Sequence, residues 1–520
     1  MTNRTIKILW ADDEIDLLRP HILFLESKNY DVQGCQSGAD AINWLETNTY
    51  DIVFLDENMP GLSGLETLDQ IKTKYPELPV VMITKNEEES LMEEAIGQKI
   101  ADYLLKPLNP NQILISLKKN LDHSRLVSEQ VTSRYQRAFR DISMEMMNVK
   151  THEDWIALYQ QFVYWELELE NSKDATLLEI MQAQKTEANL SFGKFIENNY
   201  QGWFDLPETG PILSHQLFRK YIAPEINKTQ PTLLVVIDNL RYDQWRIISP
   251  ILFQFYTNRK EINYFSILPT ATQYARNALF SGLTPLEMKR KHPDLWKDDI
   301  DEGGKNLFEA EFLNEQLKRL GLSDFSHSYH KITNVKTAQK LAQQTSEFAN
   351  HDLNVVVYNF VDTLSHAKTE VEVIKELAAD DKAYRSVTKS WFSNSPLLKI
   401  IRQAQHLGLK LILTTDHGTI NVKHPSKLIG DRETSINLRY KTGRSLTYND
   451  KDTYASKEPE RIGLPSLTMN SSFVFAKSDA YFVYPNNYNY FVNYYRNSFQ
   501  HGGVSLEEMI VPLIICDPKS

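Results

Sequence analysis

Three acidic residues in the first quarter of the chain stand where they could hold a metal ion. Asp12 and Asp13 come just after the apolar run Ile6 to Trp10. Asp56 comes directly after a second apolar run, Tyr50 to Leu55. Carboxylates that converge on one point repel each other, and a hard cation such as Mg²⁺ relieves this repulsion through oxygen ligands. A carboxylate can also attack phosphorus and form an aspartyl phosphate.

Two further polar residues end apolar runs of the same segment. Thr84 follows Val80 to Ile83, and Lys106 follows Ala101 to Leu105. A hydroxyl and an ammonium group can bond the oxygens of a phosphoryl group beside them. Apolar runs separated by helix-length segments predict a parallel sheet, whose functional residues gather at the carboxyl ends of the strands. One such residue could be a plain helix cap or loop charge, but five at matching strand ends indicate one site.

A second group of potential metal ligands lies beyond residue 230. Asp238 follows the apolar run Thr232 to Ile237. Asp416 and His417 come shortly after Leu409 to Leu413. Both runs are short enough for buried strands, so their ends would meet at the same edge of a second sheet.

Three more residues complete this group. Asp362 and His366 are four residues apart, so that a tight turn could direct both at one metal ion. His501 precedes Gly502 and Gly503, whose missing side chains allow the backbone to come close. Three aspartates and three histidines form two sets of mixed oxygen and nitrogen ligands, which suit Zn²⁺, although Mn²⁺ could compete. Two metal ions about 4 Å apart can clamp the attacking and leaving oxygens of a displacement at phosphorus.

The elements that must position these residues form three parts: residues 1–122, 123–205 and 206–520. The first and last parts alternate apolar runs with helix-length segments, which predicts an α/β multidomain protein. Pro and Gly are absent between Asn111 and Phe192, so the middle part is expected to be a helical-bundle connector. Thr151 to Asp154 looks like a capping box that begins a new helix.

Composition excludes several classes of protein. The net charge of −11 argues against a general binder of duplex DNA. The two cysteines, Cys35 and Cys516, lie at opposite ends of the chain and provide no disulfide framework, which favours a reducing compartment. The polar start of the chain does not resemble a signal peptide, and the longest apolar runs are too short to span a bilayer. We therefore expect a cytoplasmic protein without membrane insertion.

Residues 1–122 resemble the receiver domain of response regulators. The resemblance rests on the five strand-end residues and on the motifs Leu55-Asp56-Glu57-Asn58-Met59-Pro60-Gly61 and Tyr103-Leu104-Leu105-Lys106-Pro107. It implies a flavodoxin-like fold and phosphorylation of Asp56 by a sensor histidine kinase. It also implies that Asp12, Asp13 and Asp56 hold Mg²⁺, and that the switch residues are Thr84, Tyr103 and Lys106.

Residues from about 230 to the end resemble the PglZ-type branch of the alkaline phosphatase superfamily. The motifs are Ile-Asp-Asn-Leu-Arg-Tyr-Asp-Gln, Leu-Pro-Thr-Ala-Thr-Gln-Tyr-Ala-Arg-Asn, Thr-Thr-Asp-His-Gly and His-Gly-Gly-Val-Ser-Leu-Glu-Glu. The resemblance implies an alkaline-phosphatase-like α/β effector domain with two Zn²⁺ ions. One zinc would be bound by Asp238, Thr272, Asp416 and His417, and the other by Asp362, His366 and His501.

The same resemblance implies a threonine nucleophile and a covalent phosphothreonine. Thr272 is preferred over Thr270, because diesterases of the superfamily place the nucleophile second in a Pro-Thr-x-Thr pattern. Sulfate transfer needs a modified Cys or Ser, which the threonine excludes. A threonine nucleophile favours phosphodiesters, and a phosphomonoesterase is the alternative.

The segment between Gly418 and His501 is expected to cover the site and to bind a nucleotide or a short or cyclic oligonucleotide. Basic residues can track phosphates and exposed rings can stack on bases. The alternative is that the tyrosines pack in strands and the basic residues are merely solvated. The residues are Lys423, Lys427, Arg432, Arg439, Lys441, Arg444, Tyr481, Tyr484, Tyr488, Tyr490, Tyr494, Tyr495 and Arg496.

A receiver followed by such an effector resembles regulators of type IX secretion. The resemblance implies a phosphorylation-promoted homodimer. The competing hypothesis is a zinc-stabilised signalling scaffold that docks a partner such as a sigma factor without catalysis.

Overall fold

The computed structural model describes residues 5–85, 100–170, 175–430, 437–466 and 471–519. The chain divides into two compact units, Met1–Gln136 and Arg137–Ser520. Among the described helices, none combines the length and the apolar character needed to cross a membrane.

The first unit is a five-stranded parallel sheet in the order β2-β1-β3-β4-β5. This is the flavodoxin-like order, as predicted. Leu9 and Leu55 point into one apolar layer, whereas Ile8 and Phe54 point into the other, so helices cover both faces. The elements are β1 (Ile6–Ala11), α1 (Arg19–Glu26), β2 (Tyr30–Cys35), α2 (Gly38–Thr47), β3 (Ile52–Asp56), α3 (Gly64–Lys74), β4 (Val80–Thr84) and β5 (Asp102–Leu105).

Three long helices follow, in agreement with the predicted helical connector: α5 (Pro110–Asn148), α6 (His152–Glu170) and α7 (Ala175–Asn199). The capping box is confirmed, since Thr151 Oγ1 accepts from the Asp154 amide at 3.2 Å and an Asp154 carboxylate oxygen accepts from the Thr151 amide at 2.9 Å. Trp155 and Phe192 pack edge to face between α6 and α7, with ring centroids 5.2 Å apart.

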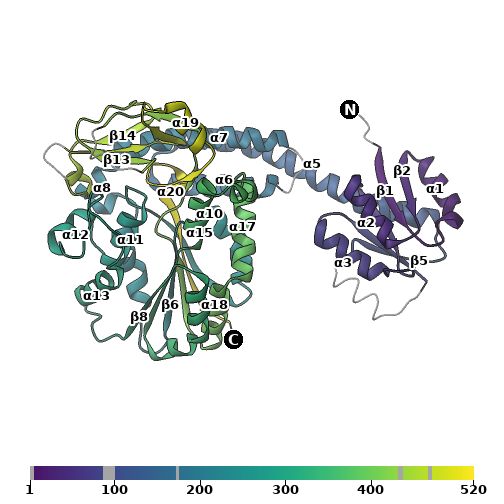
Figure 1. Cartoon of the computed structure of the whole chain (residues 1–520), viewed down its shortest axis with the longest axis horizontal. Coiled ribbons are helices and arrows are strands. Elements are labelled where there is room, and N and C mark those ends of the chain that lie inside the picture. The colour runs from purple at the N-terminus through teal and green to yellow at the C-terminus, as the bar shows by residue number, and fades with distance from the viewer. Residues whose placement is uncertain (1–4, 86–99, 171–174, 431–436, 467–470, 520) are drawn as a thin grey trace. The chain divides into compact units, whose positions relative to one another are not determined.

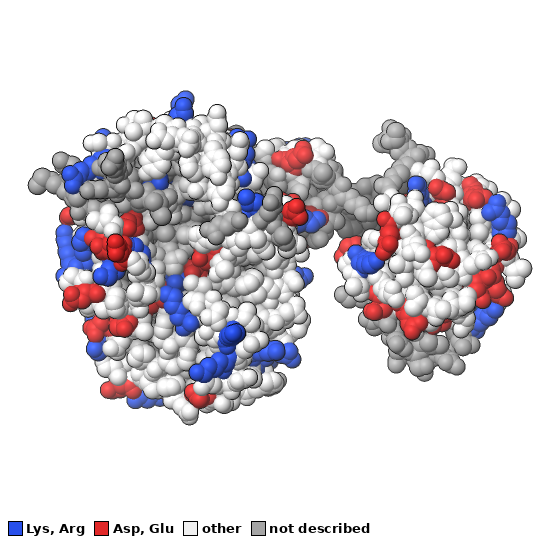
Figure 2. All heavy atoms as spheres, viewed as in Figure 1, with Lys and Arg blue, Asp and Glu red and all other residues white. Residues whose placement is uncertain are grey.

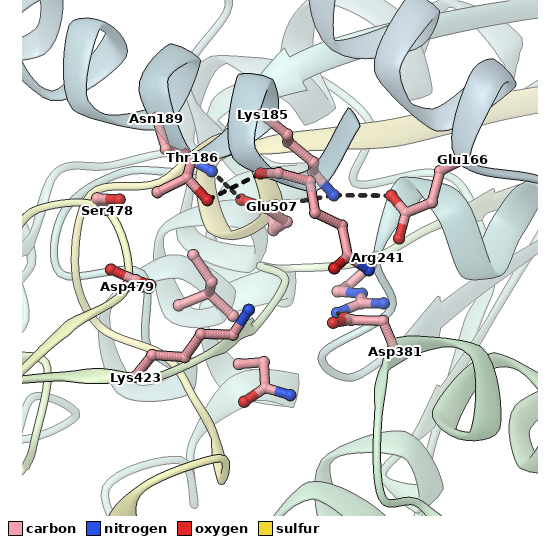
Figure 3. Close-up of a pocket in the computed structure, with 13 residues that line it drawn as sticks. Glu166, Lys185, Thr186, Asn189, Arg241, Asp381, Lys423, Ser478, Asp479 and Glu507 are labelled. Atoms are coloured by element: carbon pink, nitrogen blue, oxygen red, sulfur yellow. Dashed lines mark hydrogen bonds and ion pairs between the residues drawn. The ribbon is translucent and has the colours of Figure 1, made fainter. Parts of the chain in front are cut away.

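Buried charged side chains of α6 and α7 contact the rest of the second unit. Lys185 of α7 lies between Glu166 of α6, at 2.9 Å, and Glu507, at 3.0 Å (Figure 3). Asn189 also donates to Glu507, at 3.0 Å. Because all four side chains are largely buried, α6 and α7 pack with the effector fold as one body.

The second unit is built on a six-stranded sheet in the order β7-β18-β10-β6-β9-β8. The strands β10, β6, β9 and β8 are parallel, and β18 is antiparallel to both β10 and β7. The strands are β6 (Thr232–Ile237), β7 (Tyr256–Phe265), β8 (His327–Ile332), β9 (Leu353–Tyr358), β10 (Lys410–Thr414) and β18 (Ile510–Pro518). The central strands β6, β9 and β10 are fully buried, as uninterrupted apolar runs predict.

Helices cover both faces of this sheet (Figure 1). One layer contains α8 (Gly202–Asp205), α9 (Ser214–Leu217), α11 (Thr272–Ser281), α12 (Pro285–Lys291) and α13 (Glu309–Arg319). The other contains α10 (Tyr242–Leu252), α14 (Val335–Gln343), α15 (Phe360–Glu370), α16 (Glu372–Leu377), α17 (Asp381–Asn394) and α18 (Pro396–His406). Short 3-10 turns occur at Ile15–Leu18, Pro207–Thr209, Ala223–Glu225, Thr345–Asn350 and Pro459–Ile462, with a π-turn at Phe218–Ile222.

The described residues between Gly418 and His501 fold into small sheets and the helix α19, drawn in yellow-green at the top of Figure 1. We call this segment the cap. Its elements are β11 (Ile420–Asn421), β12 (His424–Lys427), β13 (Tyr440–Gly443), β14 (Thr453–Ser456), β15 (Ser472–Ala476), β16 (Ala480–Val483), α19 (Tyr488–Tyr495) and β17 (Phe499–Gln500). The short helix α20 (Leu506–Met509) follows it.

The structure of the cap differs from two expectations about its tyrosines and its basic residues. The alternative that the tyrosines pack in strands holds for Tyr481, which is buried in β16, whereas Tyr488, Tyr490, Tyr494 and Tyr495 lie on the helix α19. Tyr488 and Tyr495 pack on the apolar cap core, and Tyr490 is 64% exposed. Arg439 and Lys441 are buried, so they are not solvated phosphate contacts. Arg432 lies outside the described residues.

Candidate active site

The six candidate ligands of the second unit lie where neighbouring strands end. Asp238 follows β6 directly, and Asp416 and His417 follow β10. Asp362 and His366 both lie on α15, just after β9. The predicted tight turn between them is wrong, because residues four apart in a helix share one face without any turn.

The first ligand set, which we call the Asp238 set, consists of Asp238, Asp416 and His417. All three side chains are buried, and one ligand atom from each lies within 4.8 Å of the others. His417 Nε2 is 3.8 Å from both Asp238 Oδ1 and Asp416 Oδ2. The amides of Asn239 and His417 donate to Asp416 Oδ1 at 3.2 and 3.1 Å, whereas the buried Oδ2 has no hydrogen-bond partner among the described residues. A metal ion would supply that partner.

The second ligand set, the Asp362 set, consists of Asp362, His366 and His501, again within 4.8 Å of one another. Asp362 Oδ1 is 3.5 Å from His366 Nε2 and 3.6 Å from His501 Nε2. Asn239, which has a left-handed backbone with φ of 65°, donates its side-chain amide to the same oxygen at 3.4 Å. Asn239 therefore contacts both sets, through its backbone and through its side chain.

Two histidines are oriented so that their Nε2 atoms can bind a metal ion. The Nδ1 of His417 lies 3.1 Å from the Gly418 carbonyl oxygen, and the Nδ1 of His501 lies 3.1 Å from the Thr270 carbonyl oxygen. Because a carbonyl oxygen only accepts, each Nδ1 must carry the proton and leave an Nε2 lone pair free. Such backbone carbonyl bonds are the usual means of orienting metal-binding histidines.

The electrostatics of the cluster also favour bound cations. Burial and the neighbouring Asp238 raise the pKa of Asp362 to about 8 and that of Asp416 to about 6. Burial opposes ionisation of Asp238 too, but the charge and hydrogen bond of Arg276, together with the charges of His417 and His501, outweigh it and lower that pKa. Carboxylates crowded into a buried site resist ionisation until a positive charge compensates them, so the donor set fits divalent metal ions.

The two candidate nucleophiles differ in their surroundings. Thr272, the first residue of α11, lies with Oγ1 3.1 Å from His417 Nε2 and 3.4 Å from Asp238 Oδ1. Thr270 is fully buried, donates Oγ1–H to the Gly503 carbonyl oxygen at 2.9 Å and accepts from the Gly502 amide at 3.0 Å. The hydroxyl of Thr270 is therefore committed to the loop after His501, whereas that of Thr272 faces the ligands.

Sequence reasoning missed Arg276. Its buried guanidinium lies 2.6 Å from Asp238 Oδ2, 3.7 Å from Asp416 Oδ2 and 2.5 Å from Glu309 Oε1. The available signal was the spacing of four residues from Thr272, which places both on one face of α11. Glu309 carried no comparable signal.

The first unit gathers its five predicted strand-end residues. Lys106 Nζ lies 2.9 Å from Asp12 Oδ2 and 2.8 Å from Asp56 Oδ1. Asp12, Asp13 and Asp56 place ligand atoms within 4.8 Å of one another. Burial, only partly offset by Lys106, raises the pKa of Asp56. Thr84 ends β4 beside Asp56, and Tyr103 lies in the neighbouring strand β5.

The family model of the PglZ alkaline phosphatase-like domain of BREX systems matches residues 217–516. The chain belongs to the PglZ alkaline phosphatase-like family. Both ligand sets and Thr272 lie within this PglZ domain, which is a domain of a phosphoesterase superfamily. Models of the PorX response regulator linker domain and of the response regulator receiver domain match residues 125–204 and 8–118. This is the PorX-type architecture of receiver, linker and PglZ domain.

Two relatives of known function match the receiver. The chain is 36% identical to the transcriptional regulatory protein ResD of Bacillus subtilis over 118 residues, 22% of this chain and 48% of ResD. It is 31% identical to ZraR of Klebsiella oxytoca over 132 residues, 25% of this chain and 30% of ZraR. The chain thus spans less than half the length of these regulators.

Solved structures of receiver domains are also similar. A CheY-like receiver from Methanospirillum hungatei is 22% identical, with a TM-score of 0.23, and covers 23% of this chain and 96% of its own. A receiver from Clostridium thermocellum is 28% identical, with a TM-score of 0.22, and covers 23% and 98%.

Proposed function

We propose that the chain is a two-component response regulator whose PglZ domain is a two-zinc phosphodiesterase. The observation that carries the proposal is the position of Thr272, whose hydroxyl lies 3.1 Å from His417 Nε2 within the Asp238 set. Zn²⁺ held by the Asp238 set and the Asp362 set would act as a Lewis acid and lower the pKa of the threonine hydroxyl. Thr272 then needs no separate general base of its own.

The chain's own residues perform the transfer. Thr272 Oγ1 gives its proton to water and attacks phosphorus, the ester bond to the first alcohol breaks, and the leaving alkoxide takes up a proton from water. Water then cleaves the phosphothreonine and restores the hydroxyl. Thr272 stands at the N-terminus of α11, a ten-residue helix whose dipole favours the negative phosphoryl group.

Arg276 supports a diester rather than a monoester as substrate. A phosphate monoester carries a further negative charge, which a free arginine would offset. The guanidinium of Arg276 instead binds Asp238 at one end and Glu309 at the other. It is therefore not available to the substrate.

We further propose that the diester belongs to a nucleotide or to a short or cyclic oligonucleotide. Tyr490 and Tyr494 of α19 stack with ring centroids 6.0 Å apart, and Lys375 lies 5.1 Å above the Tyr494 ring. Aromatic rings beside cations suit bases and phosphates. Figure 2 shows basic side chains mixed with acidic ones on the visible face of each unit, in keeping with a small substrate rather than duplex DNA.

In the receiver we propose that Asp56 is phosphorylated by a sensor histidine kinase, with Mg²⁺ held by Asp12, Asp13 and Asp56. Lys106 would then bond a phosphoryl oxygen, and Thr84 and Tyr103 would report the change. The PorX-type architecture supports a role in type IX secretion and a homodimer promoted by phosphorylation.

The test is hydrolysis of bis-p-nitrophenyl phosphate and p-nitrophenyl phosphate by the parent protein and Thr272→Ala, with the zinc content of each. We expect two zinc ions in the parent and faster diester than monoester cleavage, lost in the variant. Faster monoester cleavage would favour a phosphomonoesterase. Zinc without turnover, even after phosphorylation of Asp56, would favour the scaffold that docks a partner such as a sigma factor.

A further inference from the structure

Arg276 and Glu309 form a fully buried ion pair beside the Asp238 set, and each is 1% exposed. Arg276 Nε lies 2.5 Å from Glu309 Oε1. The other oxygen of Glu309 accepts from Tyr329 at 2.5 Å and pairs with Lys331 at 2.9 Å. Both oxygens of Glu309 are therefore occupied, and the guanidinium is held in one orientation.

This orientation divides the two oxygens of Asp238. Oδ2 lies 2.6 Å from Arg276 Nη1. Oδ1 faces Thr272 Oγ1 at 3.4 Å and His417 Nε2 at 3.8 Å. We infer that Arg276, clamped by Glu309, is a positioning residue that holds Asp238 with one oxygen turned toward the nucleophile and the metal ligands. The inference rests on the proposed function for its kinetic consequence, but its effect on metal binding does not.

The geometry requires an arginine rather than any cation. A guanidinium presents donors in a rigid fork, so Nη1 can hold Asp238 while Nε holds Glu309. A lysine ammonium is a single point of charge and cannot hold both carboxylates in this way. Arg276 also stands one helical turn after Thr272, so the clamp fixes the nucleophile and the ligand relative to each other.

The experiment compares Arg276→Lys, Arg276→Met and Glu309→Gln with the parent protein. Zinc content and competition with a chelator measure metal affinity, and bis-p-nitrophenyl phosphate measures kcat and KM. We expect 10- to 100-fold weaker binding of one of the two zinc ions in Arg276→Met, the usual effect of removing a residue that orients a ligand. Because Arg276 does not reach the substrate, kcat should fall while KM stays within about twofold of the parent value.

Arg385→Lys is the matched control. Arg385 is also a buried arginine that bridges carboxylates, pairing with Glu166 at 3.0 Å and Asp243 at 2.5 Å, and none of its described contacts is with either ligand set. We expect Arg276→Lys to weaken metal binding and Arg385→Lys to leave it at the parent value. Equal metal affinity and kcat in the parent and in both Arg276 variants would overturn the inference.

The remaining outcomes also decide the matter. If Arg276→Met does not fold, Glu309→Gln decides, because it keeps the guanidinium and removes the negative charge that pairs with it. Glu309→Gln should then show weaker zinc binding and a lower kcat, and parent values for both would overturn the inference. A parent protein that binds two zinc ions but cleaves no diester contradicts the proposed function alone, since the metal affinities of the variants still test the clamp.

Discussion

The backbone oxygen of Thr270 accepts a hydrogen bond from Nδ1 of His501 at 3.1 Å. The side chain of Thr270 is bonded to the same loop, through Gly502 and Gly503. The strand-to-helix turn before Thr272 is thereby fastened to the loop that carries a member of the Asp362 set. This bond joins parts of the candidate active site that are 231 residues apart in sequence.

The two threonines should therefore respond differently to substitution. Thr272→Ala should lower kcat for the diester by at least about 10³-fold with unchanged stability, because it removes only the attacking hydroxyl. Thr270→Val should lower the free energy of unfolding by about 1–3 kcal/mol, because it leaves the buried Gly502 amide unpaired. Steady-state kinetics and urea unfolding of both variants are the measurements. A larger kcat loss in Thr270→Val at equal stability would reverse the assignment of the nucleophile.

Removal of metal should destabilise the second unit, because carboxylates in a buried cluster would lose their compensating charge. Zinc added back to the chelated protein should restore stability, by about 2.7 kcal/mol at 100 times the Kd. His501→Ala should bind one zinc fewer than the parent. His424→Ala is the control, since His424 is an exposed histidine that pairs only with Asp479 among the described contacts. Equal zinc content in the two variants would contradict the assignment of His501.

Lys185 should contribute more to stability than a surface lysine. Its side chain is 13% exposed, and its ammonium lies between two buried carboxylates, those of Glu166 and Glu507. Lys185→Met should cost about 3–5 kcal/mol, because it leaves negative charge uncompensated in the interior. Lys291→Met is the matched control, because Lys291 is 53% exposed and pairs with Glu287. This variant should lower the free energy of unfolding by less than about 1 kcal/mol. Similar losses of stability in both variants would show that the buried ion pairs do not stabilise the packing of α6 and α7.

His215 should make stability depend on pH. Burial lowers the pKa of this imidazole to about 4, whereas in the unfolded chain it is about 6.5. Below pH 6.5 the His215 imidazole binds a proton in the unfolded chain but stays neutral in the folded protein. The free energy of unfolding therefore falls as the pH drops from 6.5 toward 4. At pH 5 the loss attributable to His215 is about 2 kcal/mol.

The variant His215→Phe isolates this effect, because phenylalanine retains the stacking on Phe204 but cannot be protonated. Urea unfolding at pH 7 and pH 5 should show a smaller loss of stability in the variant than in the parent. The same loss in both proteins would mean that His215 does not titrate in this range.

Sequence by itself determined the strand-end residues. An apolar run followed by Asp, directly or within three residues, is a local pattern. Parallel strands must place such ends at one edge of a sheet, so the apolar pattern alone locates Asp56, Asp238 and Asp416. The spacing of Asp362 and His366 is equally visible, but it fits a turn and a helix equally well. Only the packing of α15 after β9 decided for the helix.

Only the tertiary structure determined which charged side chains form buried ion pairs. Arg276 and Glu309 lie 33 residues apart, and nothing local indicates that they meet. From the sequence, Arg439 is indistinguishable from the other basic residues of its segment. In the structure it is buried against Glu508, 69 residues later. The physical reason is that burial and ion pairing are set by which distant segments pack together, whereas strand ends are set by the chain's own apolar pattern.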